Sequence, residues 1–157
     1  MKFTHPAHLE MLIALVDNKV DFLVVGGYAV IYHGYVRATG DMDIWLRPTN
    51  ENKLKLVDVF RKLDFDPDGI KRIKERDFSE VVIFHIGNEP ERIDFLSKVP
   101  GVNFEEAFKQ RKSLIVKGRD IPFLHFNDLI ASKLVANRLK DRADVEQLMK
   151  VKRSEDK

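Results

Sequence analysis

One stretch of this 157-residue chain limits its possible folds more than any other: residues 24–46, VVGGYAVIYHGYVRATGDMDIWL. The apolar run at residues 21–27 ends at Gly26 and Gly27, which predicts a short buried strand stopped by the glycine pair. A helix is expected to begin at the glycines and to end near Gly34, and residues 42–48 predict a second strand that ends at Pro48. The stretch therefore predicts two strands joined through a tight turn and a helix.

The rest of the chain predicts helices and strands in mixed order. A proline near the start and apolar residues at helical spacing predict a helix from Pro6 to Asp17. Further helices are expected at residues 49–63, after a cap at Asn103, at 127–138 and at 141–150; strands are expected at 80–86 and 91–97, with a hairpin over 113–126 that turns at Gly118-Arg119. Residues 64–79 are expected to form a polar loop. This order predicts an α/β (α+β) fold with a mixed sheet flanked by helices, in a single domain, residues 1–157, that two helices close.

Composition excludes several classes of protein. The chain has no cysteine, which removes disulfides, thiolate catalysis and zinc sites of the Cys type. Its 27 basic and 25 acidic residues leave a net charge of +2, which gives no strong electrostatic case for a protein that coats nucleic acid. No window approaches the length of an apolar membrane span, and Pro6 and Glu10 lie where a secretory signal needs an apolar core. A cytoplasmic protein is expected.

Two aspartates on the second predicted strand are the first candidates for chemistry. Asp41 and Asp43 are two residues apart, so on a strand they project from the same face, while Met42 and Ile44 face the core. Two such carboxylates repel each other unless a cation lies between them, and oxygen ligands without sulfur or imidazole favour Mg²⁺ or Mn²⁺ over zinc. The alternative is structural, with one aspartate in a turn and the other on a solvated face of the sheet.

The glycine pair is the second candidate. A strand that runs into Gly26 and Gly27 and then into a helix leaves backbone N–H groups free to bind phosphate, and glycine has no Cβ to obstruct it. The alternative is a tight turn with no ligand. Neither the G-x-G-x-x-G fingerprint of dinucleotide-binding folds nor the Gly-Lys-Ser/Thr end of a P-loop is present.

Together, these two features resemble the nucleotidyltransferase superfamily with a catalytic core of the DNA polymerase β type. The matching residues are VVGG at 24–27 and DMDI at 41–44, with thirteen residues between Gly27 and Asp41. The sequence GYVRATGDMDI is similar to the branch of minimal nucleotidyltransferases and AbiEii-type toxins, in which R-x-T-x-D-x-D precedes the second strand. Residues 127–148 are similar to the closing helices of the AbiEii-like branch, which carry a lysine and then an R-x-K-D-x-x-D run. The resemblance implies a nucleotidyltransferase-like fold.

The resemblance also implies a third carboxylate on a later strand. Asp94, in ERIDFLS, meets this requirement, with Ile93 and Phe95 pointing to the opposite side. Burying an acid in such a strand is costly unless it is paired or binds a metal. The three aspartates would therefore be catalytic residues and ligands of Mg²⁺ or Mn²⁺. Alternatively, Asp94 lies at a wet edge or pairs with Arg92.

Further residues are expected to hold the nucleotide. The resemblance implies that Gly26, Gly27 and Lys133 hold the phosphates, although Lys133 could instead be a surface lysine. Arg37 and Thr39 are expected to bind phosphate or to position Asp41, and an arginine–aspartate structural pair is an equal alternative for Arg37.

Five other residues are given structural interpretations. Asp141 is interpreted as a cap of the last helix, with Asp144 at its N3 position. His33 is expected at a helix end, His85 in the core or sheet, and Trp45 in the core.

The activity implied is metal-dependent transfer of a nucleoside monophosphate from a nucleoside triphosphate to a hydroxyl group. The acceptor would be a protein, a tRNA end or a small molecule, and the protein could be the toxin-like component of a two-gene system with a partner protein from an adjacent gene. Many active members carry serine where this chain has Gly27, so the first alternative is a nucleotide- or metal-binding regulatory module without catalysis. The second alternative is a sugar transferase that binds a nucleotide-sugar through D-x-D.

Overall fold

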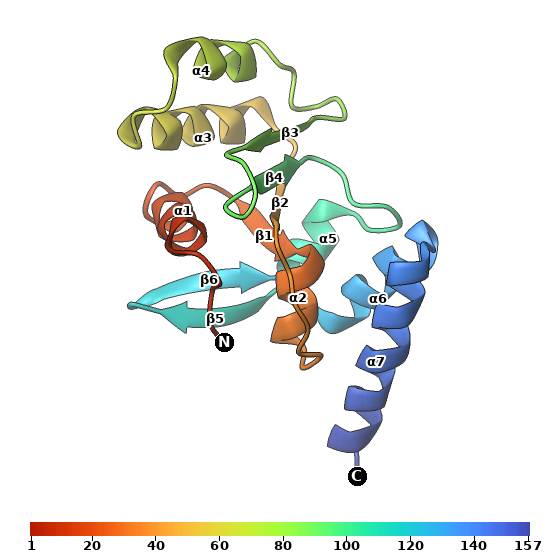
Figure 1. Cartoon of the computed structure of the whole chain (residues 1–157). Coiled ribbons are helices and arrows are strands. Elements are labelled where there is room, and N and C mark those ends of the chain that lie inside the picture. The colour runs from red at the N-terminus through yellow and green to blue at the C-terminus, as the bar shows by residue number, and fades with distance from the viewer.

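The computed structural model describes residues 1–157 and contains a six-stranded mixed sheet flanked by seven helices (Figure 1). In chain order the elements are α1 (Pro6–Asp17), β1 (Phe22–Val25), α2 (Gly26–Tyr32), β2 (Met42–Leu46), α3 (Asn50–Lys62), α4 (Pro67–Lys74), β3 (Ile83–Ile86), β4 (Ile93–Leu96), α5 (Phe104–Lys109), β5 (Lys112–Val116), β6 (Arg119–Phe123), α6 (Phe126–Ala136) and α7 (Leu139–Glu155). The strand order is β3-β4-β2-β1-β6-β5. Strand β2 is parallel to β4 and β1 to β6, and the other neighbours are antiparallel. The predicted fold class is confirmed.

Helix α4 was not expected, because residues 64–79 read as a polar loop. It begins at Pro67, and the side chain of Asp66 accepts a hydrogen bond from the Gly69 N–H, so a cap and a proline define its start. Ile70 is its one buried residue, so its apolar periodicity is too short to detect in the sequence. The hairpin also turns one residue earlier than expected, at Lys117 and Gly118, which both have positive φ angles as a two-residue type I′ turn requires.

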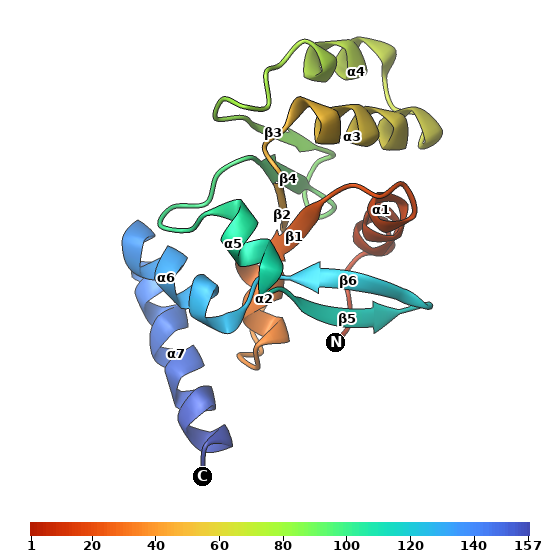
Figure 2. The same ribbon diagram turned by 180° about the vertical axis from the view of Figure 1, so that it is seen from behind.

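The helices lie at both ends and on both faces of the sheet (Figures 1 and 2). Helices α3 and α4 lie near the β3 end of the sheet, where Phe60 of α3 packs on Phe84 and Phe95, and the β5–β6 hairpin forms the other end. Helices α6 and α7 pack side by side and extend away from the sheet, and α7 carries the C-terminus. No helix has the length and apolar character needed to cross a membrane.

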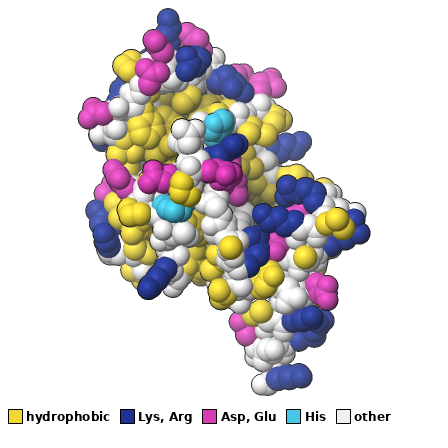
Figure 3. Space-filling model, in the orientation of Figure 1, with side chains coloured by type: hydrophobic (Ala, Val, Ile, Leu, Met, Phe, Trp, Pro, Cys, Tyr) yellow, Lys and Arg dark blue, Asp and Glu magenta, His cyan; other side chains and the backbone are white.

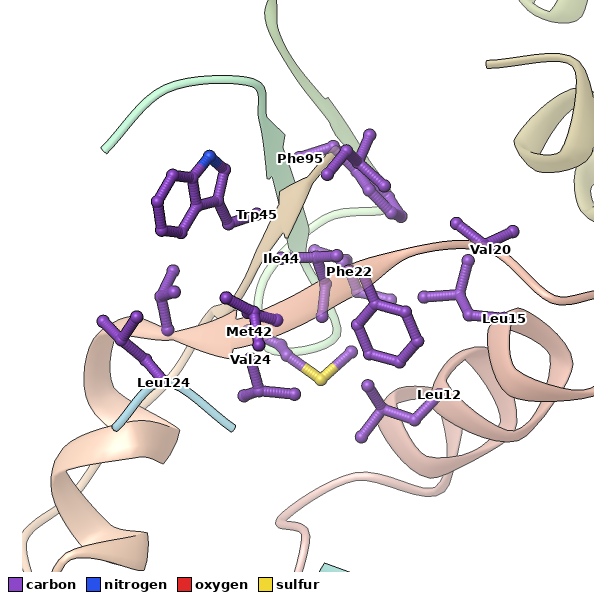
Figure 4. Packing of buried hydrophobic residues seen from close by; sticks show 14 of the residues in the cluster. Leu12, Leu15, Val20, Phe22, Val24, Met42, Ile44, Trp45, Phe95 and Leu124 are labelled. Carbon is purple, nitrogen blue, oxygen red and sulfur yellow. The ribbon is translucent and has the colours of Figure 1, made fainter. Parts of the chain in front are cut away.

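The two faces of the central strands differ in chemistry. On one face, Phe22, Met42 and Ile44 are buried, close to Leu12 and Leu15 of α1 (Figure 4), and Phe95 packs edge-on against Phe60 of α3. On the other face, Trp45 packs against Phe104 of α5. Because side chains alternate along a strand, Asp43 and Asp94 lie on the Trp45 face, opposite Ile44 and Phe95. This alternation confirms the orientation expected for the aspartates and brings them together on one face.

Candidate active site

The chain turns at Gly26 from β1 into α2 directly beside an aspartate. Gly26 has a left-handed φ of +65°, and a Cβ placed on it would lie 2.1 Å from Asp43 Oδ2. Any other residue would displace that carboxylate, so glycine is required both by its conformation and by the space available. The structure therefore brings the two sequence candidates, the glycine turn and the aspartate pair, into contact.

Gly27 faces a hydroxyl group from another part of the chain. A Cβ added to Gly27 would lie 2.2 Å from Thr39 Oγ1 and 2.9 Å from Thr39 Cβ. The space that the side chain of a serine at this position would need is thus filled by Thr39. The hydroxyl that Gly27 lacks has a counterpart supplied by Thr39 in the same part of the cleft.

We expect Gly27→Ser to destabilise the protein by about 1–3 kcal/mol, because the new side chain overpacks against Thr39. Gly27→Ser combined with Thr39→Gly should recover part of this loss, since the second change removes the obstructing side chain. Urea unfolding measures both effects. Gly40→Ser is the matched control, because a Cβ at Gly40 meets no atom within 4 Å. Equal stability of Gly27→Ser and Gly40→Ser would refute the overlap.

The three predicted carboxylates come from two neighbouring strands. Asp43 of β2 is the register partner of Asp94 of β4, and Asp41 directly precedes β2. The side chain of Arg92 lies between them: its Nη2 is 3.0 Å from Asp94 Oδ1 and its Nε is 3.9 Å from Asp41 Oδ2. The sequence alternative in which Asp94 pairs with Arg92 is therefore the arrangement that the structure has.

The expected metal ligands are not arranged as a ready-made cage. No three His, Asp or Glu side chains are placed to hold a metal ion together, and Arg92 holds Asp94 by two hydrogen bonds. The donor set nevertheless fits a hard cation, because it consists of carboxylate oxygens and the buried Oδ1 of Asp41 has no hydrogen-bond partner. A cation at this position would satisfy that oxygen after the Arg92 side chain has moved aside.

Among the acidic side chains of the site, Asp43 has the most strongly shifted pKa. Burial raises its pKa to about 6, and the negative charges of Asp94 and Asp41 add to the rise. A cation bound nearby would strongly stabilise the charged form of this carboxyl group. Acids with raised pKa values of this kind concentrate at functional sites.

Lys133 points inward, as the resemblance implied, but its ammonium group is already paired. It is 7% exposed, and its Nζ lies 2.9 Å from Asp144 Oδ2 and 3.4 Å from Asp141 Oδ1. Arg37 donates two hydrogen bonds of 2.9 Å to Asp144, one to each carboxylate oxygen. The arginine–aspartate pair that was one alternative for Arg37 exists, with Asp144 as its partner and not Asp41.

The capping interpretation of the two late aspartates was wrong in position. Helix α7 begins at Leu139, so Arg138 is its N-cap and Asp141 takes the N3 position, where it accepts a hydrogen bond from the Arg138 N–H. Asp144 lies further inside the helix and bonds to Arg37 and Lys133. The sequence offered no signal for the pairing of Asp144 with Arg37, because 107 residues separate the two.

These groups surround one cleft of about 590 Å³. The predicted residues that line it are Gly26, Gly27, Arg37, Thr39, Asp41, Asp43 and Lys133. Asp94 does not line it: it lies beside the cleft on β4, opposite Asp43 in the β2–β4 pairing and hydrogen-bonded to Arg92. Arg138 and Lys140 add two more cations on the α6–α7 side, and Figure 3 shows Lys and Arg side chains gathered over these helices beside acidic side chains near the middle of the face. One wall is therefore cationic and the floor is acidic.

Sequence reasoning missed Arg138 and Lys140, which line the cleft, and Arg92, which pairs with Asp94 beside it. Arg92 could have been found, since it lies two residues before Asp94 and on a strand shares its face. Arg138 and Lys140 belong to the R-x-K-D-x-x-D run but were not singled out.

Three aromatic residues received structural interpretations, of which two are confirmed. His33 is the C-cap of α2, where its Nε2 lies 2.7 Å from the Leu124 carbonyl oxygen, and Trp45 is buried. His85 was expected in the core or the sheet; it lies in strand β3 of the sheet, and only the core alternative was wrong. It is exposed, because Phe84 and Ile86 are the residues of β3 that face the core, and it lies opposite Asp94 in the β3–β4 pairing.

The fold and the cleft define a protein of the nucleotidyltransferase class, and comparisons with known proteins agree. Residues 7–154 match the family described as "Nucleotidyltransferase of unknown function (DUF6036)", and the chain belongs to that family. Among solved structures, it is similar to a protein of Thermotoga maritima proposed to be a nucleotidyltransferase, with 13% identity and a TM-score of 0.56. That alignment covers 94% of this chain and 96% of the other, and at this identity it supports the fold alone. No curated protein sequence matches the chain.

Proposed function

We propose that the protein transfers a nucleoside monophosphate from a nucleoside triphosphate to a hydroxyl acceptor. One observation carries the proposal: a single cleft combines the glycine turn, the carboxylates Asp41 and Asp43, and the inward lysine Lys133, with Asp94 on the neighbouring strand beside Asp43. Phosphoryl chemistry of this type needs little from a protein beyond positioning and neutralisation of charge. The cleft offers both.

The phosphates would lie on the side of the cleft formed by the glycine turn and helices α6 and α7. Helix α2 has only seven residues, so side-chain cations, more than its dipole, would attract the triphosphate. Lys133, Arg138 and Lys140 line that side, and Thr39 would donate its hydroxyl next to Gly27. Lys133 and Arg37 would exchange part of their contact with Asp144 for contact with phosphate.

The proposed cofactor is Mg²⁺ or Mn²⁺, held by Asp41, Asp43 and Asp94. When bound, such ions neutralise charge on the triphosphate and lower the pKa of the attacking hydroxyl group. The residues themselves orient the α-phosphate over the carboxylate floor. Arg92, which now neutralises Asp94 and lies near Asp41, would have to leave the carboxylates.

Arg92→Gln is therefore expected to raise the affinity for Mn²⁺ by about tenfold, because the competing guanidinium charge is removed. Mn²⁺ binding without nucleotide is measured by electron paramagnetic resonance of the free ion. Arg61→Gln serves as the control, since Arg61 pairs only with the exposed Asp58 on α3. An unchanged or weaker Mn²⁺ affinity in Arg92→Gln would contradict a cation site at these carboxylates.

The test of the function is a transfer assay with triphosphates labelled at the α-phosphate, supplied with Mg²⁺ or Mn²⁺ and with protein, tRNA and small-molecule acceptors. Calorimetric titration with Mg²⁺-ATP is run beside it. We expect binding of nucleotide and label on one acceptor class. Preference for nucleotide-sugars over free triphosphates would favour a sugar transferase instead.

A second candidate function is a nucleotide-binding module without catalysis. The observation that favours it is the internal pairing of the site, in which Arg92 neutralises Asp94 and Asp144 holds Lys133. Binding of nucleotide with no transfer to any acceptor would support this reading. We also propose that the protein belongs to the AbiEii-like branch and acts with a partner protein from an adjacent gene. This part of the proposal rests on the R-x-T-x-D-x-D motif at residues 37–43.

A further inference from the structure

Strand β3 is an open edge of the sheet. It pairs only with β4, and the other side of it has no neighbouring strand. Ser97 donates its N–H to the Val82 carbonyl oxygen, so residues 82, 84 and 86 direct their backbone groups to β4. The N–H and C=O groups of Ile83 and His85 therefore point outward and are free to pair with another strand.

This edge lacks the charges that usually protect an edge strand. Residues 81–86, VVIFHI, carry no Lys, Arg, Asp or Glu, and Val81 and Ile83 are 61% and 66% exposed. The edge strand at the opposite end, β5, begins at Lys112 and is followed by Lys117 in its turn. The sheet thus protects one edge with charge and leaves the other uncharged.

A groove of about 890 Å³ runs beside the open edge. Its floor contains Phe65, Ile73, Phe84 and Ile86, all partly exposed and packed on the core. Phe84 stacks on Phe95 at 5.2 Å and Phe65 stacks on Phe60 at 5.0 Å, so the floor is packed against core aromatic residues. Its rim mixes Arg72 and Arg76 with three acids, which gives no preference for a strongly charged ligand.

Strand β3 adjoins the strand that carries Asp94, but the groove floor and the carboxylates lie on opposite faces of the sheet: Phe84 stacks on Phe95, whereas His85 shares the Asp94 face. A strand added to β3 would present alternate side chains to the groove and to the Asp94 face. His85 lines the groove and is also the register partner of Asp94. In an in-line displacement, the attacking hydroxyl group approaches from the side opposite the leaving pyrophosphate. The cations Lys133, Arg138 and Lys140 mark the pyrophosphate side, so the acceptor enters from the β4–β3 side.

We propose that the acceptor is a polypeptide that binds as an added strand along the open edge of β3, with apolar side chains in the groove floored by Phe65 and Phe84. This inference rests on the proposed function. A backbone edge of alternating N–H and C=O groups is matched by another polypeptide backbone. A nucleic acid would need an excess of cations along this approach; β3 has none, and three acids balance the two arginines on the groove rim.

In the reaction, the oxygen of a Ser, Thr or Tyr side chain beyond the docked segment bonds to the α-phosphorus. The bond from the α-phosphorus to the bridging oxygen breaks, and pyrophosphate leaves with that electron pair. The hydroxyl proton passes to Asp94 or to water and then to solvent. The products are a nucleotidylated polypeptide and pyrophosphate, so atoms and charge balance without another reactant.

The probe is a library of short synthetic peptides with serine, threonine or tyrosine fixed at the central position, incubated with α-phosphate-labelled triphosphates and Mn²⁺. Bulk tRNA is the competing acceptor. Ile83→Pro removes one outward N–H from an edge position, where proline is tolerated, and Ile83→Val is its control. Ile73→Lys puts a charge over the groove floor and tests the site without a change in β3.

We expect label on peptides with alternating apolar residues. The rate of peptide labelling should fall five- to tenfold (about 1 kcal/mol) in Ile83→Pro and in Ile73→Lys. Binding of Mg²⁺-ATP should be the same in all variants, which shows that the nucleotide site is intact. Label on tRNA and not on peptides would overturn the inference and leave the proposed function standing. Peptide labelling unaffected by both variants would overturn it as well, and so would sedimentation of the protein as a dimer that Ile83→Pro dissociates. No label on any acceptor would instead count against the proposed function itself.

Discussion

Asp43→Asn is expected to reduce the rate of nucleotidyl transfer by at least about 10³-fold and to stabilise the folded protein at neutral pH. Transfer should fail because the central carboxylate of the cleft, which lies against Gly26 and beside Asp94, loses its charge. Stability should rise because Asp43 is buried among like charges, and burial with the charges of Asp94 and Asp41 raises its pKa to about 6. A residue whose removal helps folding and ends activity is retained for function.

The pH dependence of this effect has a definite sign. The folded protein holds the Asp43 proton more tightly than the unfolded chain, whose pKa is near 3.8. The contribution of Asp43 to stability is therefore fully present below about pH 4 and is lost as the pH rises to about 6, a change of about 3 kcal/mol. Urea unfolding of wild type and Asp43→Asn in EDTA from pH 4 to 8 should show curves that diverge as the pH rises.

Asp58→Asn is the matched control, because Asp58 is an exposed aspartate on α3 that pairs only with Arg61. Its unfolding curves should stay within about 0.5 kcal/mol of wild type. If the stability curves of Asp43→Asn and wild type run parallel over this pH range, the carboxyl group is not strained in the folded protein. Full transfer activity in Asp43→Asn would remove Asp43 from the mechanism.

The parts of this site that were predictable from the sequence depend on local periodicity. The placement of Asp43 and Asp94 on one face follows from two-residue alternation between apolar neighbours. Gly26 was recognisable because a strand ran into it, and Lys133 because its helix face was apolar. The fold class followed from the same signals, since each long element carried a clear period.

The parts that were not predictable depend on partners distant in the chain. Nothing near Arg37 identifies Asp144 as its partner, and nothing near Gly27 shows that Thr39 fills its side-chain space. His85 was assigned to the core or the sheet, because alternation gives two faces and does not say which one is covered. The cover depends on α3, whose Phe60 meets Phe84 edge-on, and such tertiary contacts override local pattern.

The site has an acidic floor and a cationic wall, and each is held by a charge of opposite sign. Arg92 neutralises Asp94 on the floor, and Asp144 and Asp141 neutralise Lys133 on the wall. A nucleotide with its metal ions supplies both missing charges at once: cations for the floor and phosphates for the wall. These three internal partners therefore stabilise the free protein and compete with its ligands.

The second large effect is expected for Asp144→Asn, which should destabilise the protein by about 3–5 kcal/mol. The carboxylate is 2% exposed and bonds to both Arg37 and Lys133. Burial alone would raise the pKa of Asp144, but the hydrogen bonds from Arg37 and Lys133 outweigh it and hold the pKa below its usual value. Its replacement leaves two buried cations without their shared counter-charge, which is the costly way to break a buried ion pair.

The same change should make nucleotide binding relatively stronger, since Lys133 and Arg37 no longer have to leave Asp144 for phosphate. Thermal unfolding with and without Mg²⁺-ATP measures both effects: a lower melting temperature for the free protein and a larger upward shift on adding nucleotide. Glu146→Gln on the same helix is the control, because Glu146 is exposed and pairs only with Lys150. A nucleotide-induced shift in Asp144→Asn no larger than that of wild type would mean that the cationic wall does not meet phosphate, and it would leave Lys133 and Arg37 as structural cations of the α6–α7 contact.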